Sequence, residues 1–109
     1  MYEIEYTPEA RDDLKSFRKF EQKYILDEID TQLQYEPNVE TRNRKKLRPN
    51  KVAEWELRID RFRVFYDVQD AMKIVKIEAI GYKRGNKFLM HGQEYDLWRL
   101  WRFLRERRR

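Results

Sequence analysis

The sequence predicts an α+β fold: a four-stranded, mainly antiparallel sheet, covered on one face by an N-terminal hairpin of two helices, with a further helix at the C-terminus. Two patterns lead to this prediction. Apolar and polar residues alternate over residues 1–7 and again over 54–80, which is the period of a strand with one buried face. Between them, residues 8–35 carry apolar side chains at the three- and four-residue spacing of helices. A chain of 109 residues has room for one such core.

The two helices are expected directly after the first strand. Thr7 and Pro8 mark the start of the first helix, over residues 8–20, because threonine caps a helix N-terminus and proline is tolerated in the first turn. The second helix is expected over residues 21–36. Its buried face is predicted from residues four apart: Ile25, Ile29 and Leu33.

The second half of the chain predicts most of the sheet. Residues 38–52 are polar and basic and are expected to form a loop, and three strands with short connections then form an antiparallel meander. Turns are expected at Asp60-Arg61 and at Gln69-Asp70-Ala71. The helices should cover the face that carries Trp55, Leu57, Val64, Tyr66, Val75 and Ile77. The opposite face should then carry Glu56, Arg58, Arg63, Lys76 and Glu78.

Charge is segregated along the chain, although the net charge is only +5. Residues 1–41 carry 5 basic and 11 acidic side chains, residues 42–51 carry 6 and none, residues 52–95 carry 8 and 7, and residues 96–109 carry 6 and 2. A molecule polarised in this way can present a basic surface to a polyanion. Each basic segment alone could be a solvated loop or tail, but two of them around an arginine-bearing strand region favour a phosphate partner.

The composition also excludes several kinds of site. The chain has no cysteine, which excludes disulfides and thiolate chemistry, and its single histidine, His91, excludes a multi-histidine metal site. We interpret His91 as an ordinary loop residue. No apolar run approaches the ~20 residues of a membrane span, and the N-terminus lacks the pattern of a signal peptide. We therefore expect a cytoplasmic protein with no membrane contact, no metal and no cofactor.

Several motifs follow one another in a familiar order after the strand and the helix hairpin. They are Lys46-Leu47-Arg48, Trp55-Glu56-Leu57-Arg58-Ile59, Arg61-Phe62-Arg63-Val64-Phe65-Tyr66 and Ile80-Gly81-Tyr82-Lys83-Arg84. With them the chain resembles the RelE/ParE superfamily of bacterial type II toxin–antitoxin toxins, and the RelE-like branch in particular. The resemblance implies a RelE-like toxin domain over residues 1–95. It leaves residues 96–109 as a basic, aromatic-rich C-terminal helix or tail.

The RelE-like branch implies a ribosome-dependent endoribonuclease that cuts mRNA without a metal, by in-line attack of the 2′-hydroxyl on the adjacent phosphate. The implied partners are a cognate antitoxin and the mRNA and rRNA of the ribosome. Two alternatives stay open, because fold does not fix function. One is a non-enzymatic ParE-like toxin that binds DNA gyrase, and the other is a divergent, inactive binding module.

The resemblance also implies roles for individual residues. Arg63 matches the arginine that stabilises the transition state, and Arg58 lies where a basic residue assists the nucleophile. Because an arginine stays protonated at any working pH, Arg58 cannot act as a base. Glu56 lies two residues away on the same strand face and could take that role. Alternatively, Glu56 only forms a salt bridge with Arg58 or Lys76.

The remaining candidates lie near the predicted leaving group and along the expected RNA path. Lys83 or Arg84 matches a basic residue that supports the leaving group, and Tyr95 matches a tyrosine that stacks on the nucleotide, with Phe88 as a competitor. For the tail we keep four alternatives: a helix packed on its own domain, an antitoxin or dimer contact, an rRNA contact and weak membrane binding. The expected RNA-binding residues are Arg44, Lys45, Lys46, Arg48, Lys51, Lys76 and Lys87.

Overall fold

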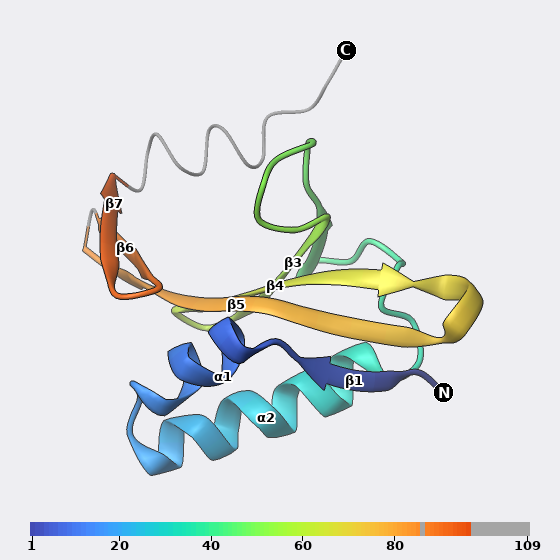
Figure 1. Cartoon of the computed structure of the whole chain (residues 1–109), viewed down its shortest axis with the longest axis horizontal. Helices are drawn as coiled ribbons and strands as arrows, with labels where there is room; N and C mark the ends of the chain where they lie inside the picture. The colour runs from blue at the N-terminus through green and yellow to red at the C-terminus, as the bar shows by residue number, and fades with distance from the viewer. Residues whose placement is uncertain (86, 97–109) are drawn as a thin grey trace.

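The computed structural model of the protein describes residues 1–85 and 87–96, so the helix expected beyond residue 96 lies outside the described residues. The described part forms two α-helices and a seven-stranded sheet, with both helices on one side of the sheet (Figure 1). The helices are α1 (Pro8–Lys15) and α2 (Lys19–Leu33). The strands are β1 (Glu3–Tyr6), β2 (Arg44–Lys46), β3 (Trp55–Ile59), β4 (Phe62–Gln69), β5 (Ile74–Arg84), β6 (Lys87–Met90) and β7 (Gln93–Asp96).

The predicted α+β fold and helix hairpin are confirmed, and the sheet extends beyond the four expected strands. Its order is β2-β3-β4-β5-β6-β7, with β1 paired in parallel with β5. The strand β5 is 11 residues long, so its first half pairs with β1 and its last residues pair with β6. The expectation of a loop over residues 38–52 is wrong for β2, whose three basic residues pair with β3 although they show no apolar alternation.

Local hydrogen bonds set the limits of the helices. The Thr7 hydroxyl accepts a hydrogen bond from the Ala10 amide at 3.1 Å and caps α1, as predicted. The helix ends at Lys15 rather than at residue 20, and the Ser16 hydroxyl donates to the Asp13 carbonyl at 2.6 Å. The Arg18 amide donates to the Glu21 carboxylate at 3.1 Å at the start of α2. None of the described helices is long and apolar enough to cross a membrane.

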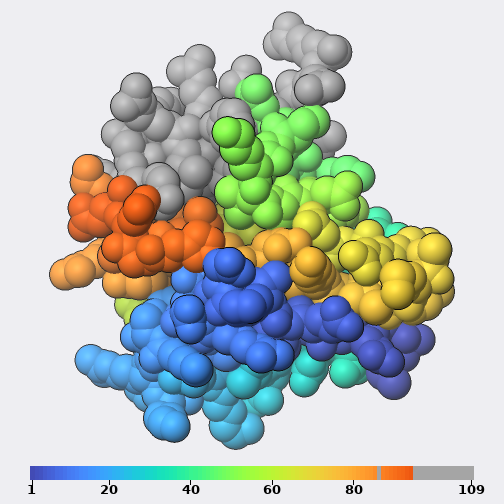
Figure 2. Space-filling model, in the orientation of Figure 1, coloured from blue at the N-terminus to red at the C-terminus, as the bar shows by residue number. Residues whose placement is uncertain are grey.

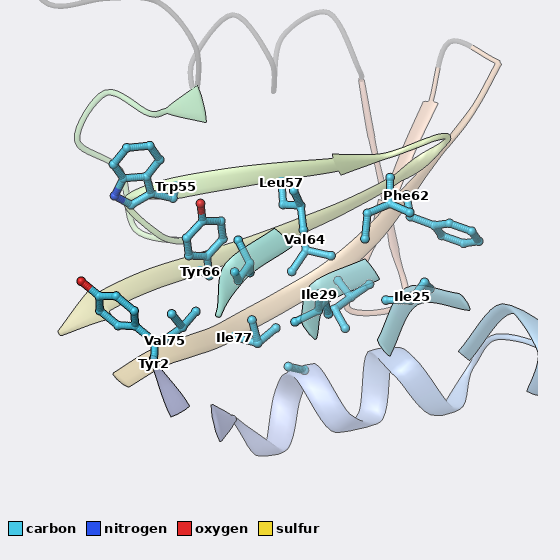
Figure 3. Close-up of a cluster of buried hydrophobic side chains, with 14 residues drawn as sticks. Tyr2, Ile25, Ile29, Trp55, Leu57, Phe62, Val64, Tyr66, Val75 and Ile77 are labelled. Atoms are coloured by element: carbon cyan, nitrogen blue, oxygen red, sulfur yellow. The ribbon is translucent and has the colours of Figure 1, made fainter. Parts of the chain in front are cut away.

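The core between the helices and the sheet contains the residues predicted to form it. Ile25, Ile29 and Leu33 of α2 have no exposed surface, and they pack with residues from β3, β4 and β5. Figure 3 shows Ile25 and Ile29 together with side chains that the strands contribute to this core, such as Val64 and Ile77. All six sheet residues expected beneath the helices are buried: Trp55, Leu57, Val64, Tyr66, Val75 and Ile77.

The second face of the sheet holds a smaller core, which the alternation pattern of the sequence does not predict. The register between β4 and β5 shifts, so that Phe65 lies opposite Ala79 while Tyr66 lies opposite Ile77. Glu78 is therefore the extra residue of a β-bulge, and the bulge turns Ala79 away from the helices and Ile80 toward them. The resulting second cluster consists of Leu47, Ala53, Phe65, Ala79, Phe88 and Met90.

Candidate functional site

The two arginines proposed for catalysis lie on the face away from the helices, as predicted. Arg58 of β3 pairs in register with Arg63 of β4, and Arg63 pairs with Gly81 of β5. Lys83 lies two residues beyond Gly81, on the same face as Phe88 of the second cluster. The sheet thus brings Arg58, Arg63 and Lys83 to one face.

Burial separates the members of this set. Arg63 is only 4% exposed, and its guanidinium donates hydrogen bonds to the carbonyls of Asp60 and Phe62, at 2.5 and 2.8 Å, across the β3–β4 turn. Glu56 has no exposed surface at all. Arg58 is half-buried and Lys83 is exposed. In this structure a substrate can contact Arg58 and Lys83, but not the proposed base Glu56.

The neighbours Lys83 and Arg84 point to opposite faces of the sheet. Side chains alternate along β5, so Arg84 shares a face with Tyr82 on the helix side and lines a cavity there. Phe88, the alternative stacking residue, is completely buried in the second cluster and cannot stack on a nucleotide from that position. The backbone of Tyr95 lies in β7, paired with Phe88. The candidates for the leaving-group end are therefore divided between the two faces.

The expected RNA-binding residues come from several elements of the fold. The Arg44 guanidinium donates to the Gln32 carbonyl at 2.6 Å and to the Val39 carbonyl at 3.0 Å, which ties the end of α2 and the chain after it to β2. The Lys46 ammonium lies 5.6 Å from the centre of the Trp55 ring. The remaining positions are distributed over β2, the loop before β3, β5 and β6: Lys45, Arg48, Lys51, Lys76 and Lys87.

The basic loop between β2 and β3 is organised by Asn50, a residue that is not among the predicted site residues. Its side-chain nitrogen donates to the carbonyls of Arg48 and Ala53 at 2.7 and 2.9 Å. Its side-chain oxygen accepts from the amides of Val52 and Ala53 at 2.7 and 3.0 Å. Asparagine often closes turns in this way, but its position in a basic run gave no indication of four bonds.

A cavity of about 780 Å³ lies between α1, the β3–β4 turn and the β5–β6 hairpin. A buried carboxylate, Asp13, stands at its inner wall, and the His91 ring lies 3.0 Å from it. His91 is therefore not an ordinary loop residue, contrary to our interpretation of the sequence. No local signal marks this pair, because 78 residues separate the two in the chain. The cavity is lined by Glu9, Asp12, Asp13, Ser16, Phe17, Arg18, Glu21, Arg61, Ile80, Tyr82, Arg84, Leu89, Met90, His91 and Gly92.

Two carboxyl groups meet on the other side of the sheet. Burial, followed by a hydrogen bond with Asp67 and the charge of Asp67, raises the pKa of Glu78 from 4.5 to about 7. The Asp67 carboxylate also accepts a hydrogen bond from the Glu54 amide at 2.8 Å, where the basic loop meets β3. Within residues 1–85 and 87–96, no group of three or more histidines and carboxylates is arranged to hold a metal ion.

This raised pKa predicts a pH-dependent stability. The folded protein binds the Glu78 proton more tightly than the unfolded chain does. The protonated Glu78 carboxyl therefore contributes fully to stability below about pH 4.5, and this contribution is lost as the pH rises through about 7. We expect Glu78→Gln to be more stable than the wild type at pH 8 and to lose less stability between pH 5 and 8. Urea unfolding at both pH values measures this. Equal losses in the two proteins would contradict it.

Comparison with known proteins identifies the family of this fold. The family model described as "ParE toxin of type II toxin-antitoxin system, parDE" matches residues 4–86. The chain belongs to this family. The resemblance to the RelE/ParE superfamily is thereby confirmed. In this ParE-family toxin, the matched residues run from β1 to β5 and include both helices. It ends before the turn that carries His91.

Two solved structures similar to this ParE-family toxin are toxin–antitoxin complexes. One is the RelBE2 complex from Mycobacterium tuberculosis, with 23% identity, 75% of this chain and 98% of that chain covered, and a TM-score of 0.66; its likeness concerns the fold. Another is the RelE–RelB complex from Pyrococcus horikoshii OT3, with 26% identity, 77% and 96% coverage, and a TM-score of 0.60. Comparison with curated proteins gives no match.

Proposed function

We propose that this ParE-family toxin is neutralised by a cognate antitoxin and inhibits translation by cutting mRNA on the ribosome, without a metal ion. The antitoxin is supported by the two similar structures, which are toxin–antitoxin complexes; the match covers 98% and 96% of the matched chain in each. The RNA target is supported by the arrangement of positive charge on the toxin itself.

One observation carries the RNA proposal: exposed cations occupy both faces of the sheet at one place. Lys83 and Arg84 are consecutive, exposed and directed to opposite faces at the end of β5, and Arg58 is half-exposed on the Lys83 face. A single RNA strand crossing this edge would meet a cation on each side. Guanidinium groups suit such a path, because they can hold two phosphate oxygens at once.

The chemistry proposed is attack of a 2′-hydroxyl on the adjacent phosphate, which needs a group that accepts the hydroxyl proton. Arg58 cannot accept it, since an arginine stays protonated. Glu56 has no exposed surface, and Arg63 is occupied by the turn carbonyls. The helix-free face therefore supplies positive charge to an RNA strand, and the acid–base group has to come from elsewhere.

A second function, binding of DNA gyrase without RNA cleavage, is favoured by the burial of Glu56 and Arg63. A face on which Glu56 and Arg63 are closed to substrate suits a protein that acts by binding alone. The family model also carries the ParE name, and the wider superfamily includes gyrase poisons.

The two functions are separated by assays on the same purified protein. Incubation with ribosomes programmed with mRNA, in EDTA concentrations that leave the ribosomes intact, is expected to yield mRNA cut in the decoding site with 2′,3′-cyclic phosphate ends. Supercoiling by DNA gyrase is expected to continue in its presence. If the mRNA stayed intact and gyrase were inhibited, the result would contradict mRNA cleavage and support gyrase binding.

A further inference from the structure

The turn between β6 and β7 presents His91 in an unusual backbone conformation. His91 and Gly92 both have a positive φ, 55° and 72°, in the two-residue connection between the paired residues Met90 and Gln93. Positive φ at both central positions is the geometry of a tight hairpin turn that glycine and asparagine usually supply. A histidine there carries a conformational cost, and its ring is directed back to α1.

The contact that the ring makes is with a carboxylate that is already held in place. The Asp13 side chain is 6% exposed, and one of its oxygens accepts a hydrogen bond from the Ile80 amide of β5 at 2.9 Å. Its other oxygen lies 3.0 Å from Nδ1 of His91. Figure 2 shows the β6–β7 hairpin lying against α1, the helix that carries Asp13. The carboxylate thus joins α1, β5 and the hairpin.

This geometry determines where the neutral ring carries its proton. An ionised carboxylate can only accept hydrogen bonds, so beside an ionised Asp13 a neutral His91 ring donates from Nδ1 and keeps the lone pair of Nε2. The His91 side chain is 37% exposed, in contrast to the buried Asp13. A partly exposed histidine oriented by a buried carboxylate is the arrangement of a general base.

The cavity wall around His91 provides the other requirements of an RNA site. Arg84 lines it from β5 and Arg61 from the β3–β4 turn, and the Arg61 guanidinium lies 5.4 Å from the centre of the Tyr82 ring. The rings of Phe17 and Tyr82 also line it, and aromatic faces bind unstacked bases. Cations, an aromatic wall and an oriented histidine therefore share one cavity of about 780 Å³.

We infer that His91, oriented by Asp13, is the general base of RNA cleavage, and that the reaction takes place in this cavity on the helix side of the sheet. Nε2 takes the proton of the 2′-hydroxyl while that oxygen forms a bond to phosphorus. The bond from phosphorus to the 5′-oxygen breaks, and its electron pair stays on that oxygen, which takes a proton from water. The products are a 2′,3′-cyclic phosphate and a 5′-hydroxyl, and His91 returns its proton to water.

The charges around the cavity place the phosphate within it. Glu9 and Asp12 of α1 line the wall beside Asp13 and repel a phosphate. Arg61 is paired with Glu21 at 2.5 Å, which leaves Arg84 of β5, with Arg18 at the start of α2, to hold the phosphate charge. The scissile phosphate is therefore expected on the Arg84 side of His91. The inference rests on the proposed function, because a general base has a role only if RNA is cut.

His91→Asn is the sharpest test, because asparagine tolerates a positive φ and remains polar, but it cannot take a proton. On programmed ribosomes we expect single-turnover cleavage to fall about 100-fold or more, with an unchanged unfolding midpoint. The cleavage rate of the wild type should depend on pH, and the residual rate of the variant should not. A variant with the wild-type rate and pH profile would overturn the inference and leave the proposed function standing. If the wild type itself cuts no mRNA, both the inference and the proposed function are wrong.

Asp13→Asn tests the positioning role separately. Its amide oxygen can still accept the Ile80 hydrogen bond, while its NH₂ group would donate to Nδ1 and move the ring proton to Nε2. We expect ¹⁵N NMR of the His91 ring to show the Nδ1–H form in the wild type and the Nε2–H form in the variant, with cleavage reduced about 100-fold or more. An Nε2–H ring in the folded wild type would exclude His91 as the base, whatever the rates.

Discussion

Arg84→Ala is expected to lower mRNA cleavage by about 100-fold, while Lys83→Ala at the preceding position reduces it only through weaker RNA binding. Arg84 lines the cavity that contains His91, and a cation that stabilises a phosphate in the transition state typically contributes a factor of about 100–1000. Lys83 lies on the other face, where it can contact only the RNA strand that approaches the cavity. The two side chains are adjacent, exposed and equal in charge, so each variant serves as the control for the other.

The measurement is the single-turnover rate at saturating toxin, together with the affinity for programmed ribosomes across a salt series. The Lys83→Ala variant should reach the wild-type rate at saturation. Its affinity for programmed ribosomes should depend less steeply on salt, because one phosphate contact is lost. Arg84→Ala should remain slow at saturation. The reverse result, a slow Lys83 variant and a fast Arg84 variant, would move the reaction to the helix-free face and remove His91 from it.

Gly81→Ala is expected to destabilise the fold more than any other glycine substitution in the described chain. A methyl group at this position would lie 2.5 Å from the Leu89 carbonyl oxygen and 2.6 Å from the Phe88 ring. The carbonyl belongs to the β6 backbone, so relief requires that β6 move away from β5. We expect a loss of about 3 kcal/mol, at the upper end of the range for overpacked cores.

Gly85 supplies the matched control for this effect. It has a φ of +59°, but nothing lies within 4 Å of the position of an added methyl group. Gly85→Ala should therefore cost about 1 kcal/mol from backbone strain alone. Urea unfolding of both variants separates crowding from strain. If the Gly81 variant were as stable as the Gly85 variant, the result would contradict the close packing of Phe88 against β5.

The helix-facing core could be predicted from the sequence because each of its elements signals its own buried face. Ile25, Ile29 and Leu33 repeat every four residues, and Trp55, Leu57 and Ile59 alternate with polar neighbours. The bulge at Glu78 could not be predicted in the same way. Apolar residues occur in both alternation phases of β5, so the sequence is compatible with either face before and after the bulge.

The candidate site was predicted only where it depends on strand alternation. The placement of Arg58 and Arg63 on one face follows from the sequence, but strand alternation does not indicate that Arg63 is buried while Arg58 is only half-buried. The pair of Asp13 and His91 gives no local signal, since 78 residues separate the two in the chain. Contacts between remote segments are set by tertiary packing, which periodicity does not report.

The hydrogen bonds of Arg63 affect how genetic screens on this protein should be interpreted. Cells that survive expression of a toxin are enriched in any substitution that removes it, whether by stopping the chemistry or by sending the polypeptide to proteases. An arginine that is buried and joined to two carbonyls of a turn belongs to the second group. Survivors altered at Arg63 would thus resemble catalytic mutants on a plate, while an immunoblot of the same colonies would show little toxin.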